Sequence, residues 1–220
     1  SGTWTDKVAP GATSATGHKA GAYVSFGEGD DPVLMKVGIS FVSTANAEEN
    51  LAKEIPGWDF DAVHAAAKAK WTKALDKIQA EGGTPEQRTI FYTGVYHMLL
   101  SPNVFSDENG EYTGFEWKVR RLPPGKKQFA NFSDWDIYRN TIQFQALLYP
   151  EQTSQMMQSL VYDAEQSGWL PRWAPANDNS YIMGGDSSAI LVSEAYAFGS
   201  RDFDAKTALK YMLKGATVPG

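Results

Sequence analysis

The sequence contains no cysteine, few histidines and no surplus of positive charge. Without cysteine, disulfide frameworks, thiol nucleophiles, thiolate zinc sites and iron–sulfur clusters are excluded. The three histidines, His18, His64 and His97, are scattered along the chain, which argues against a metal site built from imidazoles. Because 20 basic residues face 26 acidic ones, giving a net charge of −6, no nucleic-acid partner is expected. No apolar run approaches the roughly 20 residues of a membrane helix, so no membrane span is expected either.

The sequence does contain enough apolar material for a large core. Of its 220 residues, 42% are hydrophobic and 13% aromatic, including 7 tryptophans. These proportions are typical of a globular chain and exclude global disorder. Any catalysis has to use carboxylates, hydroxyls, arginine, lysine or tyrosine.

The residues from Met35 to Phe41 alternate between apolar side chains and small or polar ones. A period of two predicts a half-buried antiparallel strand. One or two strands do not make a stable sheet, so we interpret this segment as the end of a larger β domain.

From residue 44 onward the apolar period changes to that of helices. The strongest start is Thr84, which is followed by Pro85 and Gln87 and predicts a capping box. Asn109-Gly110 predicts a hairpin turn between Val104-Phe105 and residues 112–117. Although residues 107–110 begin like a calcium loop, they lack its flanking helices and its downstream glutamate. Helices are predicted near residues 44–55, 59–81, 84–100, 133–149, 151–167, 187–199 and 203–215.

Residues 131–139 form the segment richest in chemistry, with Asp134, Trp135, Asp136 and Arg139 at the start of a helix. Carboxylates accept hydrogen bonds from neighbouring sugar hydroxyls, and an aromatic face covers the apolar side of a sugar ring. A purely structural explanation is also open. Ser133 and Asp136 have the spacing of a capping box, acid in the first turn suits the helix dipole, and Asp136 and Arg139 have the spacing of an i,i+3 ion pair.

Two further segments are candidates for binding. Trp169 and Trp173 bracket a proline and an arginine in a long loop, where binding residues concentrate, but they could equally anchor that loop to the core. Asp186 follows two glycines at the start of a helix, where it could contact a ligand or cap the helix. The glycine spacing does not match a phosphate loop.

Taken together, these motifs resemble glycoside hydrolase family 92, the calcium-dependent inverting exo-α-mannosidases. The likeness extends over about residues 20 to 220. No single motif is specific, but six of them occur in the family's order. The matching stretches are residues 36–43, 57–61, 86–93, 102–107, 132–139 and 168–173.

The resemblance implies a mostly α fold that is part of a two-domain enzyme. Residues 1–43 would be the end of an N-terminal β-sandwich, residues 44–83 linker helices, and residues 84–220 the opening helices of an (α/α)6 catalytic barrel. The family's Trp-Asp pair in the mannose pocket corresponds to Trp135 and Asp136. On this basis the predicted substrate-binding residues are Trp135, Asp136, Arg139, Trp169, Trp173 and Asp186.

The family's acid, base and calcium groups lie mostly in later barrel segments, which include a Gly-Asn-Ala-Trp-Gln and a Gly-Asn-Asp-Asp stretch. Neither stretch occurs in this sequence. An inverting glycosidase needs two carboxyl groups roughly 6.5–9.5 Å apart, and no catalytic residue or calcium ligand can be named here. We therefore interpret the chain as an inactive piece of a larger enzyme.

The resemblance also implies calcium as cofactor, mannose-containing glycans and the remainder of the same polypeptide as partners, and a secreted or periplasmic location. Two alternatives stay open. One is another (α/α)6 inverting glycosidase that acts on α-glucosides, and the other is a non-catalytic glycan-binding domain.

Overall fold

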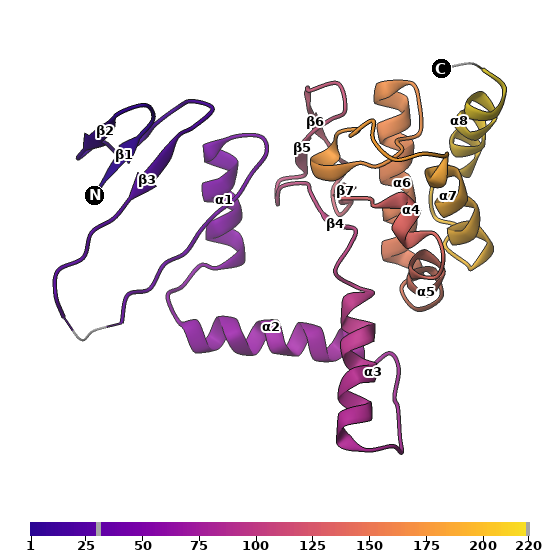
Figure 1. Cartoon of the computed structure of the whole chain (residues 1–220), viewed down its shortest axis with the longest axis horizontal. Coiled ribbons are helices and arrows are strands. Elements are labelled where there is room, and N and C mark those ends of the chain that lie inside the picture. Colours follow the sequence, from indigo (N-terminus) through magenta and orange to yellow (C-terminus); the bar gives the residue numbers. More distant parts are fainter. Residues whose placement is uncertain (30–31, 219–220) are drawn as a thin grey trace. The chain divides into compact units, whose positions relative to one another are not determined.

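The computed structural model describes residues 1–29 and 32–218 and divides the chain into two units, Ser1–Met35 and Lys36–Gly220 (Figure 1). The first unit contains a three-stranded antiparallel sheet of β1 (Gly2–Trp4), β2 (Val8–Pro10) and β3 (Gly21–Tyr23). β1 is the central strand, so that Gly2 lies opposite both Pro10 and Tyr23. The second unit is mostly helical and contains all the predicted site residues.

The predicted strand over residues 35–41 is wrong. This segment has no strand pairing, and its apolar side chains, Ile39 among them, are mostly exposed. From Lys36 onward it lies against the helix α1 (Thr44–Glu54), where the Asn50 amide donates to the Ile39 carbonyl at 2.9 Å. A Cβ atom on Gly38 would lie 2.2 Å from the Ala47 carbonyl oxygen, so only glycine permits this approach. Contacts with a helix therefore replace the expected sheet.

Two further helices follow α1, and their starts match the sequence prediction. α2 (Phe60–Leu75) begins at Asp59, whose side chain accepts from the Ala62 amide, and it contains no buried residue. α3 (Pro85–His97) begins with the predicted capping box of Thr84 and Gln87. α2 ends at Leu75, before the predicted residue 81, and beyond it the Tyr92 hydroxyl of α3 accepts from the Ala80 amide and donates to the Ile78 carbonyl.

Four short strands separate α3 from the later helices. β4 (Asn103–Val104) pairs with β7 (Phe129–Ala130), and β5 (Glu111–Thr113) pairs with β6 (Val119–Arg121). The predicted hairpin around Asn109-Gly110 is therefore wrong. These two residues form a turn, but the strand before it pairs far along the chain with β7, a choice that local sequence does not reveal.

The remaining elements are α4 (Asp134–Ile137), α5 (Thr141–Leu148), α6 (Pro150–Ser167), the 3-10 turn η1 (Pro175–Asn177), α7 (Ser187–Ala197) and α8 (Ala205–Thr217). The predicted helix over 133–149 is two helices, because Asn140 leaves the helical region with φ −155° and ψ −21°. The central helix, α6, contacts α5, α7, α8 and β7 and carries much of the buried core, including Met157 and Leu160 (Figure 1). Gly168 ends α6 in the left-handed conformation.

Candidate functional site

Trp135 and Asp136 lie on the outer side of the short helix α4. Trp135 is 46% exposed and Asp136 is also exposed, whereas Asp134 and Ile137 on the other side of α4 are buried. Two structural explanations for Asp136 are wrong, because the Ser133 side chain makes no capping hydrogen bond and, among the described residues, no ion pair joins Asp136 to Arg139. The third holds, since Asp136 lies in the first turn of α4, where an acid interacts favourably with the helix dipole. The indole and the carboxylate are thus accessible to a ligand.

Arg139 is exposed and its guanidinium lies 5.7 Å from the centre of the Tyr138 ring. This contact with a neighbouring aromatic ring orients the guanidinium without neutralising its charge. Arg139 can therefore still donate hydrogen bonds to a ligand.

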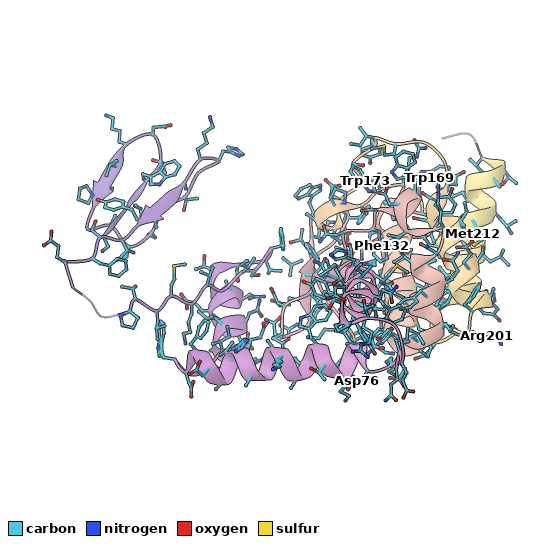
Figure 2. The ribbon with its side chains drawn as sticks, turned by 60° about the horizontal axis from the view of Figure 1, so that its bottom comes forward. Asp76, Phe132, Trp169, Trp173, Arg201 and Met212 are labelled. Carbon is cyan, nitrogen blue, oxygen red and sulfur yellow. The ribbon has the colours of Figure 1, made fainter. Side chains whose placement is uncertain are left out.

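Trp169 and Asp186 line the same pocket of about 380 Å³ beside α8, together with Ser188 and Leu213. Trp169 follows Gly168 at the end of α6 (Figure 2). The Lys214 ammonium lies 4.1 Å from the centre of the Trp169 ring. Asp186 precedes α7 but its side chain does not cap this helix. The structure thus brings two of the six predicted residues together, whereas Trp135, Asp136, Arg139 and Trp173 do not line this pocket.

Trp173 is half-buried in the long loop between α6 and α7. Its carbonyl accepts a hydrogen bond from the Ser180 amide at 2.9 Å, which closes part of the loop. The next residue, Ala174, is fully buried and bridges to Phe132 of the segment before α4. The loop that carries both tryptophans is therefore attached to the segment that carries Trp135 and Asp136.

A buried serine makes a second connection between these segments. The Ser188 hydroxyl, in the first turn of α7, is within hydrogen-bond distance of both the Asp134 carboxyl group and the Pro171 carbonyl. Ser188 is 1% exposed and Asp134 is fully buried. Ser188 thus connects the start of α4, the loop between Trp169 and Trp173, and the residues after Asp186.

The interior behind α4 contains two buried carboxyl groups and no balancing cation within the described residues. Burial raises the pKa of Asp134 well above its ordinary value, although the Ser188 hydroxyl opposes this rise. Burial also raises the pKa of Asp163, on α6, and the nearby Asp134 carboxyl raises it further. The amide of Gln128 donates to Asp163 at 3.0 Å. Each of the two acids retains one buried oxygen that has no partner among the described residues.

Sequence reasoning named Asp134 in its segment but did not predict that it is buried, and it did not single out Ser188 or Asp163. A signal was nevertheless present. Asp134 precedes the apolar Ile137 by three residues, which places both on one face of α4, and Trp135 and Asp136 on the other. The partner, Ser188, lies 54 residues along the chain, and only the fold identifies it.

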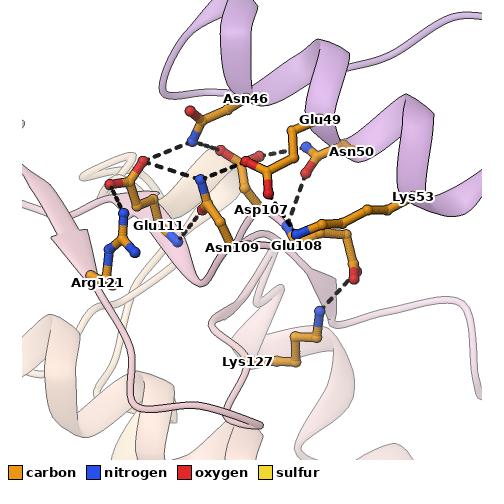
Figure 3. Close-up of polar contacts among 10 residues, drawn as sticks. All are labelled: Asn46, Glu49, Asn50, Lys53, Asp107, Glu108, Asn109, Glu111, Arg121 and Lys127. Carbon is orange, nitrogen blue, oxygen red and sulfur yellow. Dashed lines mark hydrogen bonds and ion pairs between the residues drawn. The ribbon is translucent and has the colours of Figure 1, made fainter.

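The residues that resemble the start of a calcium loop have a structural role. Both Asp107 oxygens accept hydrogen bonds from α1, at 2.8 Å from the Asn46 amide and 2.7 Å from the Asn50 amide (Figure 3). Glu111 accepts from Asn46 and from Arg121. These acids fasten α1 to the turn before β5, and their oxygens are occupied by protein donors.

The described part of the chain contains no group of three or more His, Cys, Asp or Glu residues that could hold a metal ion. The residues present therefore do not fit the calcium that the resemblance implies, and no catalytic step can be derived through it here. In residues 1–29 and 32–218, no helix is both long and apolar enough to cross a membrane.

Comparisons with known proteins agree with this description. A curated relative, an uncharacterized secreted glycosidase from Arthroderma benhamiae, is 37% identical over 209 residues, which are 91% of this chain and 22% of that protein. Two solved structures from Bacteroides thetaiotaomicron are similar. The family GH92 α-mannosidase BT3965 has a TM-score of 0.77 and 27% identity over 82% of this chain and 24% of its own. The family GH92 inverting mannosidase BT2199 has a TM-score of 0.74 and 29% identity over 82% and 25%.

The chain thus spans about a quarter or less of the length of these relatives. The family model described as the glycosyl hydrolase family 92 catalytic domain matches residues 46–220, which include every candidate site residue. The chain belongs to glycoside hydrolase family 92.

Proposed function

We propose that this chain is part of an enzyme that removes terminal α-linked mannose from glycans with inversion. The observation that carries the proposal is the exposed Trp135–Asp136 pair, which follows the buried Asp134 and in which Asp136 makes neither the capping hydrogen bond nor, among the described residues, an ion pair with Arg139. Relatives described as mannosidases support it, and one of them, BT3965, was also solved with mannoimidazole.

In this proposal the chain contributes part of the mannose pocket. The Asp136 carboxylate accepts hydrogen bonds from two neighbouring sugar hydroxyls, and the Trp135 indole covers the apolar side of the ring. Arg139, Trp169, Trp173 and Asp186 are the further candidates for contacts with the glycan. Since Trp169 and Asp186 share a pocket that the other four do not line, they would contact a more distant part of the substrate.

The general acid, the general base and the calcium ligands would come from outside these residues. Calcium, when bound, would stabilise charge that develops at the sugar during the reaction. We further propose the architecture that the family implies: residues 1–43 as the end of a β-sandwich, 44–83 as linker helices and 84–220 as the first helices of an (α/α)6 barrel. A secreted location is proposed from the printed name of the Arthroderma relative.

The test is Asp136→Ala in the whole enzyme. Loss of two charge-assisted hydrogen bonds is expected to lower kcat/KM for an α-mannoside by roughly 100-fold or more, with little change in thermal stability. Asp202→Ala is the matched control, because Asp202 is an exposed acid that lies in the segment before α8, outside the proposed site. Product stereochemistry by NMR and removal of calcium with a chelator test inversion and calcium dependence.

Three outcomes would contradict the proposal. Asp136→Ala could leave turnover unchanged and lower only stability, which would make Asp136 a structural residue. The whole enzyme could hydrolyse α-glucosides and not α-mannosides. Alternatively, it could bind mannose without any turnover, as a glycan-binding domain would.

A further inference from the structure

The Ser188 hydroxyl has two oxygen neighbours but only one hydrogen to donate. A serine hydroxyl carries one hydrogen, and a backbone carbonyl can only accept. The Ser188 oxygen nevertheless lies within hydrogen-bond distance of two oxygens, one on Asp134 and one on Pro171. If Asp134 were ionised, one of these two contacts would join two buried oxygens with no hydrogen between them. A proton on Asp134 satisfies both, because Asp134 then donates to Ser188 and Ser188 donates to Pro171.

The surroundings of Asp134 favour the same protonation state. Its side chain is fully buried, its second oxygen has no partner, and no lysine, arginine or histidine forms an ion pair with it among the described residues. The acidic groups that face this part of the interior are Asp163 on α6 and, beyond it, Glu116. An ionised carboxylate would therefore be buried next to other acids, with hydrogen bonds from Ser188 and from the Asp134 backbone but no cation to compensate its charge within the described residues.

The three residues joined by these hydrogen bonds lie next to the candidate site residues in the sequence. Asp134 is adjacent to Trp135 and Asp136, Pro171 lies between Trp169 and Trp173, and Ser188 follows Asp186 by two residues. The segments come from three separate parts of the sequence, and the Ser188 oxygen contacts the other two. Loss of the Ser188 hydroxyl would remove its contacts with both of the other segments.

We propose that Asp134 is a protonated, neutral positioning residue which, through the Ser188 hydroxyl, holds the three segments of the mannose pocket in place. Asp134 touches no sugar in this scheme and acts only through Ser188. The part of this inference that concerns the pocket rests on the proposed function, whereas the protonation state of Asp134 does not.

The experiment compares Asp134→Asn, Asp134→Ala and Ser188→Ala in the whole enzyme. An asparagine amide is neutral and can still donate to Ser188, so Asp134→Asn is expected to keep KM for an α-mannoside within about 3-fold of the natural enzyme. Asp134→Ala and Ser188→Ala break the chain of hydrogen bonds, and each is expected to raise KM by roughly 10-fold or more. The conservative variant thus separates a neutral positioning group from a charged one.

Ser159→Ala is the matched control for Ser188→Ala. Ser159 is also a fully buried serine, but its hydroxyl bonds to Phe129 and Gln155, away from the three segments. We expect this variant to lower the melting temperature to a similar extent and to leave KM unchanged. If Ser159→Ala raises KM as much as Ser188→Ala does, loss of stability alone explains the effect and the positioning role is wrong.

The protonation state is measured without reference to activity. A difference infrared spectrum between the natural protein and Asp134→Asn at neutral pH is expected to contain the carbonyl band of a protonated carboxyl group. A carboxylate band in its place would overturn the inference, as would an Asp134→Asn variant with the same KM as Asp134→Ala. If the enzyme does not hydrolyse mannosides at all, the proposed function fails while the infrared result still decides the state of Asp134.

Discussion

Tyr112 belongs to a small apolar cluster with Phe105, Leu122 and Ala130, and its phenol is almost completely buried. The hydroxyl accepts a hydrogen bond from the Gln166 amide at 2.9 Å. Burial raises the pKa of Tyr112 from 10.0 to about 12, since the desolvation outweighs the opposing effect of Gln166, and the Asp163 carboxyl adds to the rise. The folded protein therefore holds this proton at pH values at which the unfolded chain has lost it.

The protein is therefore expected to become less stable at alkaline pH. Between about pH 10 and about 12 the native state binds more protons at Tyr112 than the unfolded state does, so the free energy of unfolding falls as pH rises through this range. Tyr112→Phe is expected to lose about 1 kcal/mol near neutral pH, because the Gln166 amide loses its acceptor. It is also expected to show a smaller alkaline decline in denaturant titrations. Equal declines in both proteins would contradict the raised pKa.

Single residues show how far the sequence could predict the site. Trp135 and Asp136 were predicted as site residues from the family resemblance and from the combination of an indole with a carboxylate, and the structure leaves both exposed. Asp134 was not identifiable as a buried acid, since its partner Ser188 becomes a neighbour only in the folded chain. Hydrogen bonds over long sequence separations are what local patterns do not contain.

Helix α1 is attached to the rest of its unit mainly by polar contacts. Its two buried residues are Asn46 and Asn50, and both donate to Asp107 (Figure 3). The Ser40 hydroxyl donates to the same carboxylate at 2.7 Å. Although each amide also has a second acceptor, Glu111 for Asn46 and the Ile39 carbonyl for Asn50, Asp107 is the acceptor that the two amides share.

Asp107→Ala is therefore expected to loosen α1 as a unit. Removal of the acceptor should lower the free energy of opening of α1 by about 2 kcal/mol, which speeds hydrogen exchange of residues 44–54 roughly 30-fold. Glu48→Ala is the control, because Glu48 is an exposed acid of the same helix. If exchange in α1 is equally fast in both variants, Asp107 does not anchor the helix.

Element boundaries were predictable where local chemistry determines them. The capping box of Thr84 and Gln87 fixes the start of α3, and Asp59 fixes that of α2. The segment from Met35 to Phe41 has the period of a strand, but a strand also needs a partner with free backbone groups, and Gly38 brings the chain against α1 instead. Asn140 divides the helix predicted over 133–149, and an asparagine alone does not predict a helix break.

Within the second unit, many large apolar side chains on the helices lie at the surface. Leu209 and Leu213 of α8 are 53% and 56% exposed, and Ile190 of α7 is 42% exposed. α2 contributes no buried residue at all. Single exposed apolar residues are common on protein surfaces. Apolar faces on several helices are instead typical of surfaces that another part of a protein covers. This pattern is consistent with a chain that matches about a quarter of its relatives' length.

The 220 residues expressed alone are therefore expected to bind a hydrophobic dye and to self-associate, whereas the whole enzyme should do neither strongly. Replacing Leu209 and Leu213 with glutamate should reduce dye fluorescence of the isolated chain, because both contribute to the exposed face of α8. Lys210→Glu, at a neighbouring exposed position, is the control for the added charge. Dye fluorescence measures the exposed apolar surface, and sedimentation measures self-association. A sharp, cooperative melt of a monomer that binds no dye would mean that these apolar faces need no cover, and the proposal of a larger barrel would lose its physical support.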